Sequence, residues 1–493
     1  MLSPSRGVRS ARHQIFAVSL RIALLLLPLL TLAAPREAHA YQWMLKHGYP
    51  TCGACHTDPS GGELLTFYGR MQSEVTLSMP WGGSGGSAYN LPSKAPRLAR
   101  DPSSFAAHAK LADKDGEGEK VELEEDAPAD ANATEGADAA EEKEEDKPAE
   151  EAAPAPAAAP AEDDDGLSGI TPFLFGLWSP PDWLLLGGSY RHMNIIKPSG
   201  DDKFKTFPMM LDVYGQMQFG SFKLGGSIGG ARVPAGSPYA RSAQVTTGQG
   251  DQWNLISRTF YVGYEIMPEL QVRLGRLQMP FGVRIPEHTM WVRQYTRTDR
   301  ESSQQDGLSI NYSAESFRFE VLGIAGNYQI NPDKFRERGY SAYFEYFATP
   351  KTAIGLNSLM TMAKDDKLLA NGKKMTRQAH GAMVRAAVSE SVVVVAELDG
   401  LLRSNFDPGY VGFTQVDWEA TQGLHFMATG EILDEGYSQD PKAPERAPGA
   451  GKPKLGAWLS ASWWFLPHFD VRIDGVARQE EDFSILAQLH VYL

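Results

Sequence analysis

The chain holds two cysteines, and both fall in one short run, Cys52-Gly53-Ala54-Cys55-His56. This run matches the attachment motif of c-type haem. Two thiols three positions apart can bond to the two vinyl groups of one porphyrin as thioethers, and the adjacent His56 then places an imidazole nitrogen under the iron. We therefore predict one haem c, bound covalently by Cys52 and Cys55, with His56 as the axial metal ligand.

Two other uses of such a cysteine pair are a disulfide oxidoreductase and half of a zinc site. A redox dithiol normally accompanies a thioredoxin-like βαβ pattern, which the sequence lacks. A structural zinc site needs more ligands at matching spacing. The second axial ligand stays open between Met44, His47, Met71, Met79 and a vacant position. A methionine would raise the reduction potential, whereas a vacant position would permit ligand binding.

An export signal precedes this motif. Basic residues from Arg6 to Arg21 lead into an apolar run, residues 22–34, that is too short to cross a bilayer as a helix. Ala38-His39-Ala40 then offers small residues at the two positions that a signal peptidase reads. Residues 1–40 are predicted to be a secretory signal, with a membrane anchor as the alternative.

Charge divides the mature chain into parts. The formal net charge of the whole chain is −14, but residues 101–165 alone hold 23 Asp and Glu against five Lys. This Ala-, Glu- and Pro-rich stretch is predicted to be a disordered linker, because it cannot bury enough apolar surface to offset its chain entropy. It separates a haem-binding segment, residues 41–100, expected to be mostly helical or irregular, from residues 166–493. No basic patch suggests nucleic-acid binding.

Residues 166–493 show the two-residue period of β-strands. Apolar and polar side chains alternate in 270–274, 317–321 and 469–474, and more loosely in 424–429. The polar positions of these runs, expected on the inner face, are mixed in sign: Arg273, Arg318, Glu320, Asp470, Arg472 and Asp474.

The connections between strands carry a further pattern. Tight turns are predicted near Gly220, 267–268, 314–315, 349–350, 389–390, 421–422 and Pro467, with mostly longer polar loops between them. Alternating short and long connections are typical of a transmembrane antiparallel β-barrel, with tight periplasmic turns and long outer loops. Seven hairpins plus a first and a last strand give about 16 strands, and both chain ends then lie on the periplasmic side. A soluble β-sandwich or propeller is the alternative.

Two further features favour a lipid environment. Six tryptophans lie near predicted strand ends, where interfacial girdles form: Trp183, Trp253, Trp418, Trp458, Trp463 and Trp464. The last predicted strand, Phe483 to Leu493, places Phe483, Ile485, Ala487, Leu489, Val491 and Leu493 on one face.

Parts of the sequence resemble known bacterial proteins. Residues 48–52 with Gly61-Gly62 and Tyr68-Gly69 look like the short haem segment at the head of certain outer-membrane barrel proteins. Gly275-Arg276 with Pro280-Phe281-Gly282 resembles a strand-end motif of phosphate-selective porins. The chain departs from such barrels at its end, Val491-Tyr492-Leu493, where they usually finish on an aromatic residue.

The longest predicted connection, about Leu277 to Gly307, joins strands five and six. The resemblance to general porins implies that this loop folds into the lumen as a constriction. Four arginines, Arg284, Arg293, Arg297 and Arg300, outnumber Glu287 and Asp299 within it. Rings of arginine in a pore favour anions. An outer loop with solvated charges is the alternative.

These patterns favour an outer-membrane, porin-like barrel with a periplasmic monohaem segment that acts in electron transfer at the cell envelope. One haem cannot carry electrons across the bilayer alone, so a periplasmic or multihaem cytochrome partner is expected. The alternative is a passive porin for small, perhaps anionic, solutes, with a structural or sensory haem. No acid–base constellation beside the motif suggests an enzyme.

Overall fold

The computed structural model describes residues 43–47, 52–59, 61–79, 178, 180–199, 203–233, 252–287, 289–299, 303–326, 336–365, 373–438 and 452–493. The predicted secretory signal and the predicted acidic linker lie outside these described residues. Both therefore stay predictions from the sequence.

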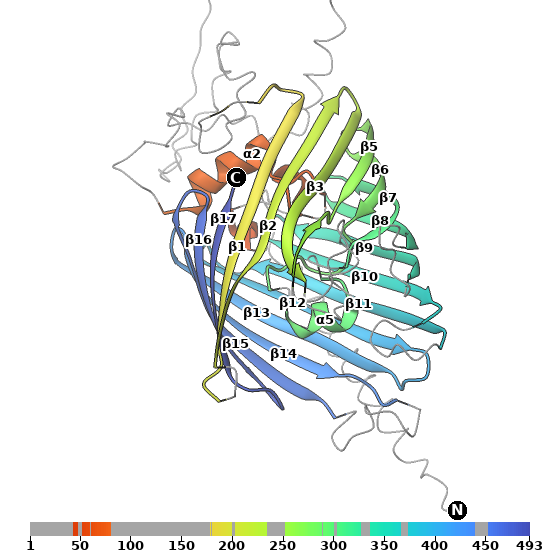
Figure 1. Ribbon diagram of the computed structural model, residues 1–493, viewed down its shortest axis with the longest axis vertical. Coiled ribbons are helices and arrows are strands. Elements are labelled where there is room, and N and C mark those ends of the chain that lie inside the picture. The colour runs from red at the N-terminus through yellow and green to blue at the C-terminus, as the bar shows by residue number, and fades with distance from the viewer. Residues whose placement is uncertain are drawn as a thin grey trace, which may run out of the picture. The chain divides into compact units, whose positions relative to one another are not determined.

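The C-terminal part of the chain forms one continuous antiparallel sheet (Figure 1). Its strands are β1 (Leu184–Ile196), β2 (Phe204–Phe219), β3 (Phe222–Val233), β4 (Gln252–Ile256), β5 (Phe260–Met267), β6 (Leu270–Leu277), β7 (Gln305–Ser313), β8 (Phe317–Gly326), β9 (Arg338–Thr349), β10 (Thr352–Ala363), β11 (Met375–Ala387), β12 (Val392–Arg403), β13 (Gly409–Thr421), β14 (Leu424–Asp434), β15 (Lys454–Leu466), β16 (Phe469–Arg478) and β17 (Ser484–Tyr492).

The sheet closes on itself, because β17 pairs with β1 and sets Tyr492 opposite Ser189. Strands β4 and β5 both pair with β3, so they are successive halves of one strand that is interrupted at 257–259. The barrel therefore has 16 strands, as the sequence predicted. Closure pairs the edge strands and leaves no free sheet edge, which is what a β-structure in lipid requires.

All seven predicted tight turns are confirmed, each between two consecutive strands. Phe219 pairs with Phe222 across the first, and Leu466 with Phe469 across the last. Most connections at the other end of the barrel are longer, as expected, although β12–β13 and β16–β17 are joined there by five residues each, 404–408 and 479–483.

Side chains alternate between the two faces of the wall, as the period of two predicted. In β6, Leu274 points outward with 61% of its surface exposed, whereas Arg273 points inward and is 1% exposed. Leu459 of β15 is 71% exposed on the outer face. A closed antiparallel barrel with an apolar outer surface and a polar interior is the architecture of outer-membrane proteins.

The predicted tryptophan girdle is correct for four residues and wrong for two. Trp183, Trp253, Trp418 and Trp463 are about half exposed on the outer surface, but Trp458 and Trp464 are buried. Trp464 follows Trp463 directly, and consecutive residues of a strand must face opposite sides. Trp458 lies on the inner face, where its indole N–H donates to Glu431 at 2.6 Å.

Outward aromatic rings gather at the tight-turn end. Trp183 stacks on Phe219 at 5.9 Å beside the first turn, and Trp463 contacts Phe465 at 5.5 Å beside the last. Amphipathic rings at this level match the interfacial belt of a membrane protein.

The N-terminal segment has only short helices among its described residues. They are η2 (Trp43–His47), η3 (Cys52–Ala54), α2 (Phe67–Gln72) and η4 (Ser73–Leu77). This matches the expected mostly helical or irregular segment. No helix in the described part of the chain is both long and apolar enough to cross a bilayer.

The outer face of β15 offers a test of the membrane assignment. Leu459→Arg should destabilise the folded barrel by about 2–4 kcal/mol if this position lies near the bilayer midplane, because a charge would then face hydrocarbon. Reversible urea unfolding in lipid vesicles measures the change, with Leu459→Met as the control. Equal stability of the two variants would show that Leu459 does not face lipid.

Candidate haem site inside the barrel

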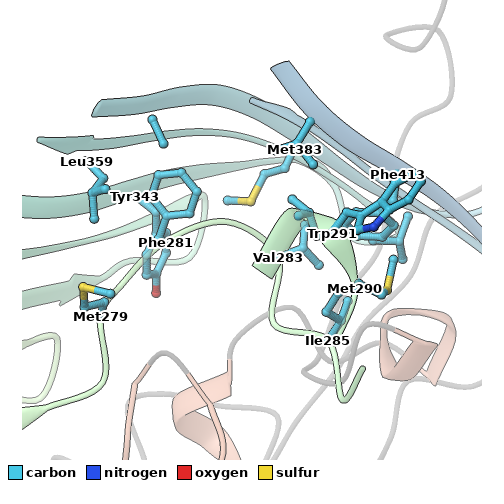
Figure 2. Close-up of a cluster of buried hydrophobic side chains, with 14 of the residues drawn as sticks. Met279, Phe281, Val283, Ile285, Met290, Trp291, Tyr343, Leu359, Met383 and Phe413 are labelled. Atoms are coloured by element: carbon cyan, nitrogen blue, oxygen red, sulfur yellow. The ribbon is translucent and has the colours of Figure 1, made fainter. Parts of the chain in front are cut away.

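The connection between β6 and β7 folds into the barrel and carries a short helix, α5 (Trp291–Thr296). Because β4 and β5 are one strand, this loop follows the fifth strand, as predicted. The residues of its inward run are nearly all buried, and they meet Leu359 and Phe413 of the wall in one hydrophobic cluster (Figure 2). We call residues 278–304 the constriction loop.

Carboxylates of the wall hold the constriction loop across the lumen. Glu397 of β12 accepts a hydrogen bond from the Val283 backbone N–H at 2.6 Å and pairs with Arg293. Glu431 of β14 accepts from the Trp291 backbone N–H at 2.7 Å. The loop is therefore anchored to strands far around the barrel from β6 and β7.

The loop arginines do not form the free positive ring that the sequence suggested. Arg293 pairs with Glu397, and Arg297 lies 3.6 Å from Glu337. Arg284 donates to the carbonyl of Met279 at 3.3 Å, and Arg300 lies outside the described residues. The loop's Glu287 is in turn paired with Arg472 of β16 at 2.5 Å. Neutralised pairs weaken the expected bias towards anions.

The cysteine motif lies on a tight turn. The backbone N–H groups of Cys55 and His56 both donate to the carbonyl of Cys52, at 3.1 and 2.9 Å. The chain then reverses, because Thr57 N–H donates to Leu64 and Thr66 N–H donates to Cys55, at 3.0 and 2.9 Å. We call residues 52–66 the attachment loop.

Two glycines let the backbone pack closely against both cysteines. A Cβ atom on Gly61 would lie 3.1 Å from the Cys52 sulfur, and one on Gly69 would lie 2.2 Å from the Cys55 carbonyl oxygen. Gly61 also has a φ of +92°, which side chains disfavour. Any other residue at these two positions would crowd the cysteines.

The thiols suit covalent attachment better than the alternative chemistries. Both cysteines are free, and burial together with Cys52 raises the pKa of the Cys55 thiol to about 12. A redox dithiol needs a lowered thiol pKa instead. The described residues contain no group of three or more His, Cys, Asp or Glu placed to bind a metal ion. Two thiols without a disulfide and the adjacent His56 are the donor set that a c-type haem requires.

One side of the barrel wall contacts the attachment loop directly. Arg273 of β6 reaches Asp58 at 3.2 Å, and Arg318 of β8 donates to the Pro59 carbonyl at 3.4 Å. Glu63 accepts from the Thr259 hydroxyl at 2.5 Å and from the Gln278 amide at 3.0 Å. Arg273 and Arg318 belong to the fifth and seventh strands around the barrel, Thr259 lies in the interruption of the fourth, and Gln278 begins the constriction loop.

The opposite side of the wall contacts the rest of the segment. Lys46 pairs with Glu419 of β13, and the carbonyl of Ser78 accepts from the Gln422 amide at 2.8 Å. The backbone N–H of Met79 donates to the carbonyl of Trp464 in β15 at 2.9 Å. Because these strands lie across the barrel from β6 and β8, the segment spans the lumen near the tight-turn end.

This arrangement differs from a haem segment that hangs freely on a tether. The described residues of the segment and of the barrel belong to one compact unit. Local sequence patterns do not predict this docking, because each contact joins residues that lie far apart in the sequence. An unusual number of charges on predicted inner strand positions was the available hint.

The four suggested distal ligands differ in their surroundings. Met44 is 1% exposed within the apolar core, and the sulfur of Met79 accepts from the Trp463 indole N–H at 2.8 Å. The side chains of His47 and Met71 lie outside what the structure describes. The identity of the distal ligand stays open.

Comparison of the sequence with protein-family models and with curated proteins gives no match. Solved porin structures resemble the barrel. OmpT of Vibrio cholerae has 10% identity and a TM-score of 0.46, and covers 63% of this chain and 99% of its own. OmpF of Salmonella typhi has 13% identity, coverages of 63% and 97%, and a TM-score of 0.45. An anion-selective porin of Comamonas acidovorans has 9% identity, coverages of 63% and 99%, and a TM-score of 0.42.

The loop anchor at Glu397 is open to test. Glu397→Gln should cost about 3–5 kcal/mol of stability, because it leaves Arg293 buried without its carboxylate. The constriction loop should then become sensitive to trypsin at Arg293 in the inserted protein. Glu315→Gln, in an exposed turn, is the matched control. Full protease resistance of Glu397→Gln would contradict the anchoring role.

Proposed function

We propose that the protein is an outer-membrane electron carrier whose barrel lumen holds one c-type haem, attached to Cys52 and Cys55 with His56 as axial ligand. The observation that carries the proposal is the position of the attachment loop, which the inward side chains of the barrel hold inside the lumen. When bound, a haem here would accept and release one electron at a time.

The chain's own residues have distinct parts in this proposal. Cys52 and Cys55 would hold the haem covalently, and His56 would supply a nitrogen ligand to its iron. The segment and the constriction loop together exclude water from the lumen. The wall side chains around them are almost fully buried, for example Arg276 and Glu320, which are both 0% exposed. Exclusion of solvent and control of burial are among the means by which a protein sets a haem potential.

A second candidate is a passive porin for small solutes, anions among them, in which the haem segment is structural or sensory. The architecture supports it, because a 16-strand barrel with a loop folded inward after the fifth strand is the general porin arrangement. The burial of lumen side chains weighs against it, since the walls of a water-filled pore are exposed.

The orientation of the barrel indicates on which side of the membrane the haem would exchange electrons. The segment docks near the tight turns, which are periplasmic in proteins of this architecture. A periplasmic or multihaem cytochrome at that end would exchange electrons with the haem. Lipid surrounds the outer wall, and a small anionic solute remains the partner in the porin alternative.

Covalent haem is the first test. A denaturing gel of the purified protein, stained for haem peroxidase activity, should show a band at the size of the mature chain. The double variant Cys52→Ala, Cys55→Ala should lose the band, and Ser78→Ala, which keeps the motif, should retain it. A stained band in the double variant would contradict covalent attachment.

Conductance separates the two candidates. In planar bilayers, the haem-bearing protein should give no discrete conductance steps, because two elements cross its lumen. Protease protection of the barrel in vesicles, measured on the same preparation, verifies insertion. Steady steps from an inserted, haem-stained protein would favour the passive porin.

A further inference from the structure

The attachment loop contacts the wall of the barrel as well as the rest of the segment. A haem attached to Cys52 would therefore meet surfaces outside the segment. The nearest such surface is the inner wall of the barrel, at β6, β8 and β9.

Arg318 is the wall residue most closely bound to the cysteine motif. Its guanidinium donates to the Pro59 carbonyl at 3.4 Å and lies close enough to the Cys52 side chain for the two groups to interact electrostatically. On its other side it donates to Glu345 of β9 at 2.7 Å, and it lies 5.2 Å from the ring centre of Tyr343. The strand pair thus fixes a cation beside one of the two attachment atoms.

Arg273 links the attachment loop to the wall in the same way as Arg318. It lies 3.2 Å from Asp58 and 2.6 Å from Glu320 of β8, and its side chain is fully buried. A planar guanidinium can bind two partners at once in a fixed geometry, which a lysine cannot do. Each arginine therefore joins the attachment loop to a second strand of the wall, Glu320 of β8 for Arg273 and Glu345 of β9 for Arg318.

We infer that the haem site is shared between segment and barrel, with Arg318 and Arg273 as positioning residues that orient the attachment loop and set the charge around it. The inference rests on the proposed function. It assigns to barrel strands a part in the haem site that the cysteine motif by itself does not indicate.

The sign of the effect follows from electrostatics. Oxidation of the iron adds one positive charge, and a buried cation nearby opposes it, so Arg318 should raise the reduction potential. Asp58 should lower the potential, because a buried carboxylate favours the oxidised iron. Removing the two charges should therefore shift the potential in opposite directions. If the substitutions only loosened the packing of the site, the two potentials would not be expected to shift in opposite directions.

The test uses the full-length protein in detergent and measures its reduction potential by visible spectroscopy. In Arg318→Gln, the ratio of ferric to ferrous protein at the wild-type midpoint should rise about tenfold, which is about 59 mV for one electron. Asp58→Asn should shift the midpoint upward. Arg318→Lys should restore part of the lost reduction potential, since lysine keeps the positive charge but lacks the planar guanidinium group.

Arg472→Gln is the matched control. Arg472 is also a buried lumen arginine, but its partners are Glu287, Asp474 and Ser460 rather than the segment. Its replacement should shift the midpoint much less than Arg318→Gln does, because none of these partners belongs to the segment. If Arg318→Gln and Asp58→Asn both behave like Arg472→Gln, the shared site is wrong while the haem stands. If the wild-type protein carries no haem, the proposed function falls and this inference falls with it. Asp58→Asn alters only the segment, so it tests the idea even if Arg318→Gln misfolds.

Discussion

A strand in lipid must satisfy its backbone hydrogen bonds without water, and this constraint determines the rest of the structure. The wall meets it by closing β17 onto β1, so every strand has two partners. Closure fixes two faces, one towards lipid and one towards the lumen. Because side chains alternate along each strand, each apolar outward residue brings a neighbour that faces inward. Leu274 and Arg273 are such a pair.

The charged side chains on the inner face of the wall must also be stabilised. In an open pore, water would solvate its charges, but here the segment and the constriction loop displace that water. Removing charges from water is costly unless each finds a partner. The lumen accordingly contains buried pairs such as Arg318 with Glu345 and Arg273 with Glu320, and pairs that join wall to loop, such as Arg472 with Glu287. Positively and negatively charged side chains are mixed along the inner strand positions, and the formation of these ion pairs requires both.

Local pattern was enough to predict the wall. A period of two and seven tight turns give 16 strands, and the inward loop after the fifth strand came from resemblance rather than from periodicity. Predictions of which face of the barrel wall a single side chain occupies were less accurate. Trp463 and Trp464 both fall near a strand end, yet only one of them can face lipid. The charge pairs escaped prediction because Arg318 and Pro59 meet across 259 positions of sequence, and no local signal records such a contact. The cysteine motif could be found because its chemistry is contained in five consecutive residues.

The barrel alone does not distinguish a channel from an electron carrier, since both need the same wall. The difference lies in what fills the lumen. A channel needs solvated charges and a continuous water path, whereas a haem buried in a membrane protein needs water excluded and its surrounding charge controlled. Here the arginines that would attract anions in an open pore are already paired, Arg293 with Glu397 and Arg297 with Glu337. Other arginines hold the loop that bears Cys52. The partners of these arginines, rather than their number, therefore set the charge of the lumen, and the pairing weakens any bias towards anions.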